Sequence, residues 1–383
     1  MTNMKPMALI PTFTPLTYLF TMFRSLLRSN PRLTVLRNHI TPPLVNQFIQ
    51  IRTMSVPATM KAVVVEETGG PEVLKFKTSY PVPTPRAGEL LVRNNISGVN
   101  YIDTYFRTGL YPAPKPEVLG REGAGIVAAV GPQTSGFQVG DRVAWLSTGG
   151  YAEYTAVPIA QTAKIPDGIS DEDIMASFLS GLTVLAFAKE AYPVQKGDWV
   201  LLHAAAGGAG FLMTQILKSI GANVIGTAGG AEKCALVKSL GADVVIDYRS
   251  EEDKDWVKKV KEATGGRGVD VVYDSVGKDT WEGSLEAVKR KGTIVWFGNA
   301  SGPVPPLPLA KLTPKCVKVA RPSLFGYIQT REEFEYYTNE LFNLLKSGQL
   351  KTKIHKIYPL EDIAQVHKDL EGRKTMGKPL LKP

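Results

Sequence analysis

The sequence predicts an α/β protein in which a mostly-β domain is joined to a domain built on a doubly wound parallel sheet. Three observations lead to this prediction. Short apolar runs punctuated by glycine fill residues 60–180, strand-like and helix-like segments alternate through 181–325, and a small-residue loop joins a strand to a helix at His203–Gly210. Alternating strands and helices imply right-handed crossovers and a parallel sheet, the Rossmann-type arrangement.

Composition sets the class of protein before any motif is considered. The chain has 383 residues, 44% hydrophobic and 21% charged, which is typical of a soluble globular protein with room for two domains. Two cysteines cannot build a disulfide framework, and a total of four histidines argues against a rich metal site. The formal net charge of +9 raises the question of nucleic-acid binding, so its distribution matters.

The positive charge is concentrated in residues 1–59, which contain no acidic residue. The basic residues of this segment are Lys5, Arg24, Arg28, Arg32, Arg37 and Arg52, and subtracting these six from nine leaves +3 for the rest. An Arg-rich, acid-free segment with serine and threonine predicts a mitochondrial transit peptide. Initiation at Met54 or Met60 would instead give a cytosolic form.

Two other interpretations of this segment are weaker. Its apolar run Met7–Phe23 is short for a membrane span and is interrupted by Pro11 and Pro15, so no stable membrane insertion is expected. In a secretory signal the charges would precede the apolar run, whereas here they follow it.

The elements of the body follow from their periodicity. Strands are expected in the first domain at Met60–Glu67, Gly88–Asn100, Gly123–Gly131 and Gly140–Leu146. In the second domain, strands are expected at Asp198–Ala204, Asn223–Gly229, Asp243–Tyr248, Val269–Gly277 and Gly292–Gly298, with helices at Gly210–Gly221 and Ala231–Ala242. The tail, residues 326–383, carries a helix at Arg331–Gly348 and a strand and helix within Lys353–Gly372, and is too short to be anything but a return to the first domain.

The loop "HAAAGGAG" is the first candidate binding element. Backbone amides at the start of a helix favour a diphosphate, Gly207 would let the backbone approach it, and Gly210 would let the helix pack on the strand. Ala205 replaces the first glycine of the dinucleotide fingerprint and fits if its φ stays negative. A small-residue turn without a ligand is the alternative.

The following strand indicates which dinucleotide would bind. An NAD site places an acid at the end of this strand, but the first acid is Glu232, past the expected position, and Lys233 follows it. A lysine suits a 2′-phosphate, so NADPH is favoured over NADH. A solvated lysine at a helix start is the alternative.

Several stretches together resemble one family. These are "ISGVNYIDTYFRTGLYP", "HAAAGGAG", "GLTV", "VYDSVGKDTWEGSL", "WFGNASG", "ARPSLFGYI" and "GRKTMGKPLL". They are similar to the zeta-crystallin-like NADPH:quinone oxidoreductases, zinc-free members of the medium-chain dehydrogenase/reductase superfamily. The resemblance covers residues 60–383 and implies a GroES-like catalytic domain at 60–180, completed by 326–383, around a Rossmann domain at 181–325. It also implies a homodimer, with Cys316–Leu324 as a candidate edge strand.

The chain departs from the zinc-dependent members of that superfamily. Asn100 stands where their first cysteine ligand would be, and Gly120-Arg121-Glu122 replaces Gly-His-Glu, so no bound metal is expected. Without a Lewis acid, an acceptor that is already electrophilic, such as a quinone, is the favoured substrate, with one- and two-electron transfer both open.

The resemblance implies the residues of the site. Asn100, Tyr105 and Tyr111 would meet the substrate, with Tyr105 able to polarise or protonate a quinone oxygen. The implied cofactor contacts are Asn100, Thr183, Gly207, Gly208, Gly229, Lys233, Tyr248, Phe297, Gly298, Arg373 and Gly377. Ser275 joins them because it ends a strand at the carboxyl edge of the sheet. Alternatively, "YIDTYFRTGLY" is a strand-to-loop segment whose aromatic side chains pack the core. His203 is expected to be a strand-end residue bonded to backbone, and Cys234 to be a packing residue.

Two other functions remain open at this level. The same cleft would serve reduction of the C=C bond of α,β-unsaturated carbonyls. AU-rich RNA binding is a second role that the resemblance implies, but the sequence has no RNP-type or KH-type signature and its body is only mildly basic.

Overall fold

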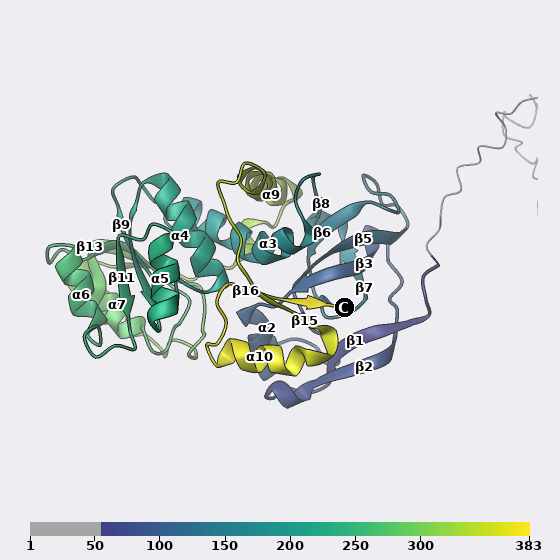
Figure 1. Cartoon of the computed structure of the whole chain (residues 1–383), viewed down its shortest axis with the longest axis horizontal. Coiled ribbons are helices and arrows are strands. Elements are labelled where there is room, and N and C mark those ends of the chain that lie inside the picture. Colours follow the sequence, from purple (N-terminus) through teal and green to yellow (C-terminus); the bar gives the residue numbers. More distant parts are fainter. Residues whose placement is uncertain (1–54) are drawn as a thin grey trace, which may run out of the picture. The chain divides into compact units, whose positions relative to one another are not determined.

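The computed structural model describes residues 55–383 (Figure 1). The predicted transit peptide therefore lies outside the described residues, except for its last few positions. Strand β1 (Thr59–Val65) already begins inside that segment, one residue before the expected Met60. One helical stretch, Asp171–Ala191, is long and apolar enough to cross a membrane, but 78% of its apolar window is buried inside the protein.

The β-rich domain contains two sheets. β1, β2 (Leu74–Pro81) and β4 (Glu117–Val118) form a three-stranded sheet in the order β2-β1-β4. The larger sheet has the order β15-β16-β3-β5-β6-β8, with β7 also paired to β3. Its strands are β3 (Glu89–Gly98), β5 (Glu122–Val130), β6 (Arg142–Leu146), β7 (Tyr154–Pro158), β8 (Thr162–Lys164), β15 (Ile354–Pro359) and β16 (Lys378–Lys382).

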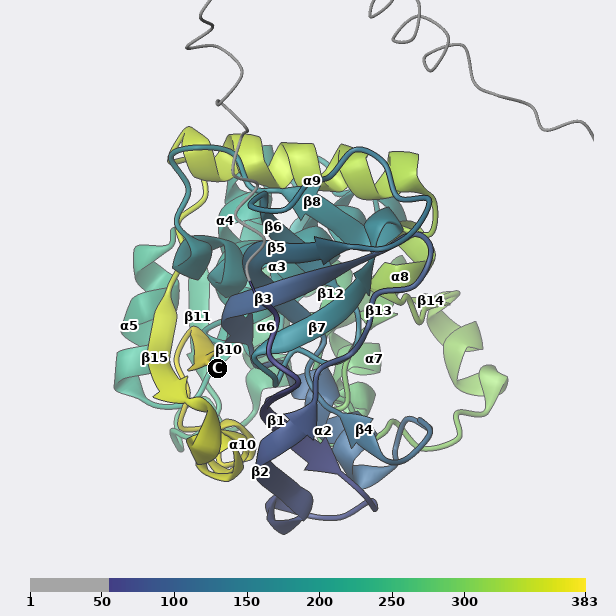
Figure 2. The same ribbon diagram turned by 90° about the vertical axis from the view of Figure 1, so that its right-hand side faces the viewer.

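The tail of the chain joins this sheet. β16 runs antiparallel to β3, with Leu380 opposite Gly98, and β15 lies parallel to β16. Figure 2 shows the sheet with α9 (Arg331–Lys346) above it and α10 (Ile363–Glu371) below. The last strand thus places residues from the C-terminus beside residues near position 100.

The second domain is a six-stranded parallel sheet in the order β11-β10-β9-β12-β13-β14. The strands are β9 (Trp199–Leu202), β10 (Asn223–Ala228), β11 (Val244–Asp247), β12 (Val269–Asp274), β13 (Val288–Trp296) and β14 (Lys318–Ala320). Helices α4 (Gly208–Ile220), α5 (Ala231–Ser239), α6 (Trp256–Ala263) and α7 (Trp281–Ala287) connect them. The order of the strands reverses at β9 and β12, and ligands collect at such a switch point.

Both faces of the parallel sheet are covered, which explains its apolar strands. In β9, Val200 and Leu202 belong to one core cluster and Leu201 to another. With the six-stranded parallel sheet and the antiparallel β-rich domain, the predicted fold class is confirmed.

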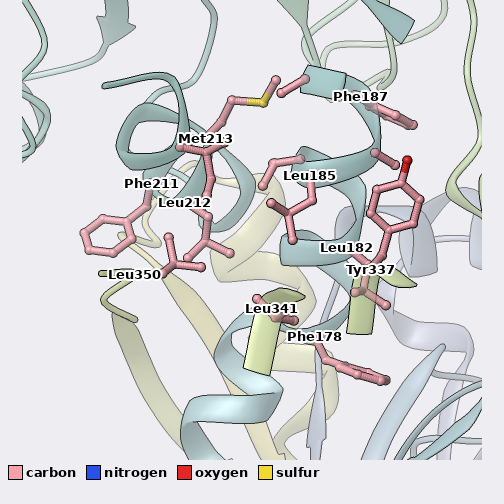
Figure 3. Packing of buried hydrophobic residues seen from close by; sticks show 14 of the residues in the cluster. Phe178, Leu182, Leu185, Phe187, Phe211, Leu212, Met213, Tyr337, Leu341 and Leu350 are labelled. Carbon is pink, nitrogen blue, oxygen red and sulfur yellow. The ribbon is translucent and has the colours of Figure 1, made fainter. Parts of the chain in front are cut away.

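A helical layer joins the two domains. α3 (Asp171–Ala186) continues into a π-helical turn (Phe187–Ala191) and packs against α4 and α9. Figure 3 shows Phe178, Leu182 and Leu185 of α3 among side chains from these helices. The remaining short elements are α8 (Leu324–Tyr327) and the 3-10 turns Pro71–Val73, Ile159–Gln161, Leu309–Lys315 and Leu360–Asp362.

The alternative interpretation of the stretch from Tyr101 is wrong. This stretch is a helix, α2 (Tyr101–Thr108), and not a strand-to-loop segment. The Asp103 carboxylate accepts a hydrogen bond from the Asn100 backbone N–H at 2.8 Å, and Gly109 ends the helix with a φ of 82°. These are standard start and stop signals for a helix, and they bring the Tyr105 side chain towards the other domain.

Candidate active site

A cavity of about 700 Å³ is lined by residues of both domains. Every residue that the sequence analysis assigned to catalysis or to cofactor binding lies on its wall: Asn100, Tyr105, Tyr111, Thr183, Gly207, Gly208, Gly229, Lys233, Tyr248, Ser275, Phe297, Gly298, Arg373 and Gly377. Residues spread over most of the chain thus meet at one place, at the carboxyl edge of the parallel sheet.

The glycine loop lies between β9 and α4, as predicted. The left-handed residue in its turn is Ala204, with φ of 53°, while Ala205 keeps the negative φ that an alanine tolerates. A Cβ on Gly210 would lie 2.4 Å from the Ala204 carbonyl oxygen, so only glycine fits there. A Cβ on Gly208 would meet nothing closer than 3.7 Å, and this face of the loop opens into the cavity.

A cluster of cations borders the cavity beyond β10. The Lys233 ammonium donates to the Arg373 carbonyl at 2.7 Å. Burial lowers the pKa of Lys233, and the nearby charges of Arg249 and Arg373 lower it further. A Cβ on Gly229 would lie 2.6 Å from the Tyr248 hydroxyl, so the two chain segments approach closely here. Sequence reasoning missed Arg249, although it directly follows Tyr248. Lys233 and Arg373 line the cavity and Arg249 lies close by; Arg373 also pairs with Asp279 at 3.2 Å, so the excess positive charge here favours an anion.

Two tyrosine hydroxyls border the cavity in the β-rich domain. Tyr105 Oη accepts from the Asn299 backbone N–H at 2.7 Å, and Tyr111 Oη accepts from Arg321 at 3.0 Å. The two rings meet edge to face, 5.2 Å apart. Within residues 55–383 neither hydroxyl proton has an acceptor, so both O–H groups remain as donors for a ligand. Burial raises the pKa of Tyr105, which keeps its hydroxyl protonated.

The side chain of Asn100, also on the cavity wall, joins three segments of the chain. Asn100 Nδ2 donates to Glu122 Oε1 at 2.8 Å, and Asn100 Oδ1 accepts from the Lys378 ammonium. Lys378 Nζ also donates to Glu122 Oε1 at 2.6 Å. The amide of Asn100 is therefore fixed in orientation, with one N–H still available. The sequence analysis identified Asn100 but missed Lys378, which adjoins Gly377.

Other predicted residues have simpler contacts. A Cβ on Gly298 would lie 2.4 Å from the Ser275 carbonyl oxygen, so the ends of β12 and β13 approach closely at the cavity. His203 is buried, and its ring bonds to the side chains of Thr227 and Ser284, at 3.1 and 3.2 Å, rather than to backbone as expected. Cys234 packs against the core, as expected.

A buried network of polar side chains packs against α2. Arg107 donates to both carboxylate oxygens of Glu371, at 3.0 and 2.6 Å, and to His367 Nδ1 at 2.9 Å. An arginine can only donate, so Nδ1 is the acceptor and the proton of His367 lies on Nε2, which faces the Tyr151 hydroxyl at 3.4 Å. That hydroxyl donates to Asp103 at 2.6 Å. The network ties α2 to α10.

This network predicts that the folded protein becomes less stable as the pH falls. Burial, with the charge of Arg107, lowers the pKa of His367 from 6.5 to about 3. Between these values the unfolded chain binds a proton that the folded chain does not, so the stability linked to His367 is complete above pH 6.5 and is lost as the pH falls. Replacing His367→Gln should therefore make the loss of unfolding free energy between pH 7.5 and 5 smaller by about 2 kcal/mol.

Urea unfolding of both proteins at the two pH values measures this difference. Burial raises the pKa of Asp103 to about 6, but this carboxyl is present in both proteins and its effect cancels in the comparison. Equal losses in the two proteins would show that His367 is not the group responsible.

Two family models match this chain. Residues 86–167 match the alcohol dehydrogenase GroES-like domain, and residues 208–343 match the zinc-binding dehydrogenase family. The chain is 44% identical over 321 residues to a probable quinone oxidoreductase of Schizosaccharomyces pombe, covering 83% of this chain and 96% of that one. It is 35% identical over 333 residues to a 2-haloacrylate reductase of a Burkholderia species, covering 84% and 98%. The crystal structure of Escherichia coli quinone oxidoreductase complexed with NADPH has a TM-score of 0.81 and 44% identity, covering 84% and 100%.

A GroES-like domain, a Rossmann domain and a cleft lined by both define a medium-chain dehydrogenase/reductase. Within that class, the chain belongs to the zeta-crystallin-like quinone oxidoreductases. The resemblance given by its motifs is thus confirmed.

The residues of this chain do not fit the zinc ion that the name of the matched family implies. Arg121, in place of a histidine, pairs with Glu117 and lies 3.7 Å over the ring of Phe106. Asn100, in place of a cysteine, is bonded to a lysine ammonium and to Glu122. Among residues 55–383 no three His, Cys, Asp or Glu side chains gather as metal ligands.

Proposed function

We propose that this protein reduces quinones with NADPH and without a metal. The observation that carries the proposal is the pair of hydroxyls of Tyr105 and Tyr111, which line the same cavity as the glycine loop. Each hydroxyl accepts a hydrogen bond from a neighbour and keeps its own proton for a ligand. Two such donors are suited to hold and polarise a carbonyl oxygen, which is what a quinone presents.

The remaining residues bind and orient the reactants. The amides at the start of α4 favour a diphosphate, and Lys233, Arg249 and Arg373 favour a 2′-phosphate. The available N–H of Asn100 suits a carboxamide oxygen. Bound NADPH supplies the hydride. The aromatic rings of Tyr105, Tyr111 and Phe297 line the cavity and offer apolar surface to the acceptor.

Reduction of activated C=C bonds is the second candidate function. The relative at 35% identity is a 2-haloacrylate reductase, and the same two hydroxyls would polarise the carbonyl of an enal or enone. Rates of NADPH oxidation with an ortho-quinone and with a 2-alkenal separate the two. We expect the larger kcat/KM for the quinone, and a larger value for the alkenal would favour the second function.

The cation cluster predicts which coenzyme is preferred. Replacing Lys233→Ala should raise the Kd for NADPH by roughly 10- to 100-fold, because a hydrogen bond to a charged group contributes about 1.5–3 kcal/mol. The Kd for NADH should not change, since NADH has no 2′-phosphate. Fluorescence titration measures both constants. Lys238→Ala, on the same helix but outside the cavity wall, is the matched control. Equal affinity of the wild type for NADPH and NADH would contradict the assignment.

We further propose that the protein forms a homodimer in mitochondria. β14 ends the six-stranded sheet, and Val319 on it is 41% exposed, so a second copy could extend the sheet at this edge. Sedimentation of the wild type and of Val319→Lys tests the dimer. Fluorescence imaging of the full-length chain and of a form that starts at residue 60 tests the mitochondrial location.

A further inference from the structure

A buried ion pair joins Lys378 of the cavity wall to Glu122, and so far its only role is to orient Asn100. The side chain of Lys378 is 3% exposed and that of Glu122 is fully buried, and their charged atoms lie 2.6 Å apart. Taking an ammonium and a carboxylate out of water costs several kcal/mol per ion, and their attraction only partly offsets this. A fold that keeps such a pair at its cleft holds charge there at a cost in stability.

The position of the ammonium is fixed from several sides. Gly377 pairs with Gly207 of the glycine loop, and the Lys378 backbone N–H donates to the Lys353 carbonyl at 2.8 Å. Glu122 in turn accepts from the Leu179 backbone N–H at 2.8 Å, at α3. The charge therefore cannot move far without shifting the cofactor loop, β16 and α3 together.

The ammonium still has hydrogen-bonding capacity. Asn100 and Glu122 are its acceptors within residues 55–383, whereas an ammonium has three N–H donors. Lys378 is a lining residue of the cavity, and no third acceptor for its ammonium is present among residues 55–383. The remaining N–H of Lys378 is a hydrogen-bond donor like the O–H groups of Tyr105 and Tyr111. Unlike them, it belongs to a group with a full positive charge.

The ammonium lies between the two segments that would carry metal ligands. Asn100 occupies the position of a cysteine ligand, and Glu122 ends the Gly-Arg-Glu stretch in place of Gly-His-Glu. Both bond directly to Lys378 Nζ. A side-chain cation from the last strand therefore bonds to both segments that the resemblance aligns with metal-ligand motifs.

We propose that Lys378 is a catalytic residue whose ammonium stabilises the negative charge that forms on the carbonyl oxygen of the acceptor. This inference rests on the proposed function. The acceptor takes up a hydride, with its two electrons, from NADPH, which is oxidised to NADP⁺. The hydride bonds to one carbonyl oxygen of the quinone, and the π electrons shift through the ring to the second carbonyl oxygen. Lys378 donates a hydrogen bond to this second oxygen and keeps its own proton, and a proton from solvent completes the hydroquinone.

Substitution of the lysine measures its contribution. Replacing Lys378→Met should lower kcat for an ortho-quinone by about 10²- to 10³-fold, the usual effect of removing one donor to a developing oxyanion. The Kd for NADPH, measured by fluorescence titration, should change by less than about threefold. Lys382→Met, at the exposed end of the same strand, is the matched control and should behave as the wild type.

The single variant leaves Glu122 buried without its partner, which destabilises the fold for a reason unrelated to catalysis. The double variant Glu122→Gln/Lys378→Met removes that charge as well, and its thermal unfolding shows whether the fold is kept. A folded double variant that stays as slow as the single variant supports the proposal. A double variant with near wild-type kcat would overturn it, because the lysine would then serve only to neutralise Glu122.

Two further outcomes overturn it. A raised Kd for NADPH with unchanged kcat at saturation would mean that Lys378 binds the coenzyme diphosphate. Loss of wild-type turnover on dialysis against a chelator would mean that a metal supplies the charge. A wild type that binds NADPH but reduces neither quinones nor enals would overturn the proposed function itself, whereas an active wild type with an equally active Lys378→Met variant overturns this inference alone.

Discussion

Replacing Gly210→Val should both destabilise the protein and abolish productive coenzyme binding. A Cβ at this position would lie 2.4 Å from the Ala204 carbonyl oxygen and 2.7 Å from Ala205 Cα, and both are backbone atoms that cannot rotate away. α4 would have to move off β9, and its first amides would move with it. We expect a loss of about 3 kcal/mol or more in unfolding free energy and roughly 10²-fold or more in kcat/KM.

Thermal unfolding and NADPH titration measure the two effects separately. Gly326→Ala is the matched control, because a Cβ there would meet no atom within 4 Å. A stable Gly210→Val protein with wild-type affinity for NADPH would show that the diphosphate does not sit on this loop.

The second large effect concerns the two hydroxyls. The double variant Tyr105→Phe/Tyr111→Phe should lower kcat/KM for a quinone by about 10²- to 10³-fold, because both neutral donors to the acceptor oxygen are lost. Each single variant should lose less, since the other hydroxyl remains. Affinity for NADPH should be unchanged, because the expected coenzyme contacts lie elsewhere on the cavity wall. Initial rates of NADPH oxidation give the measurement.

Tyr101→Phe is the control for this experiment. Tyr101 also lines the cavity, but its hydroxyl already donates to the Ala300 carbonyl at 3.1 Å and has no proton left for a ligand. Its loss should change kcat/KM by less than about threefold if donation by Tyr105 and Tyr111 is what matters. Equal losses in Tyr101→Phe and Tyr105→Phe would mean that packing of the rings is responsible.

Local patterns predicted the second domain well. The helix before Gly221 and the strands around it were visible because apolar periodicity and glycine stops depend only on neighbouring residues. α2 was missed although its signals were present, an asparagine followed three residues later by Asp103 and a glycine at 109. The aromatic residues in between obscured these signals, because they are equally typical of a strand.

The sequence by itself determined the fold class, the family and many of the residues that line the cleft. Only the tertiary structure decided that Lys378 meets Asn100 and Glu122, that Arg107 meets His367 and Glu371, and that both tyrosine hydroxyls retain a proton. The reason is the distance along the chain: the partners of Lys378 lie 278 and 256 residues before it. Such contacts depend on the register of β16 against β3 and on the packing of whole helices, and no local pattern of residue types contains that information.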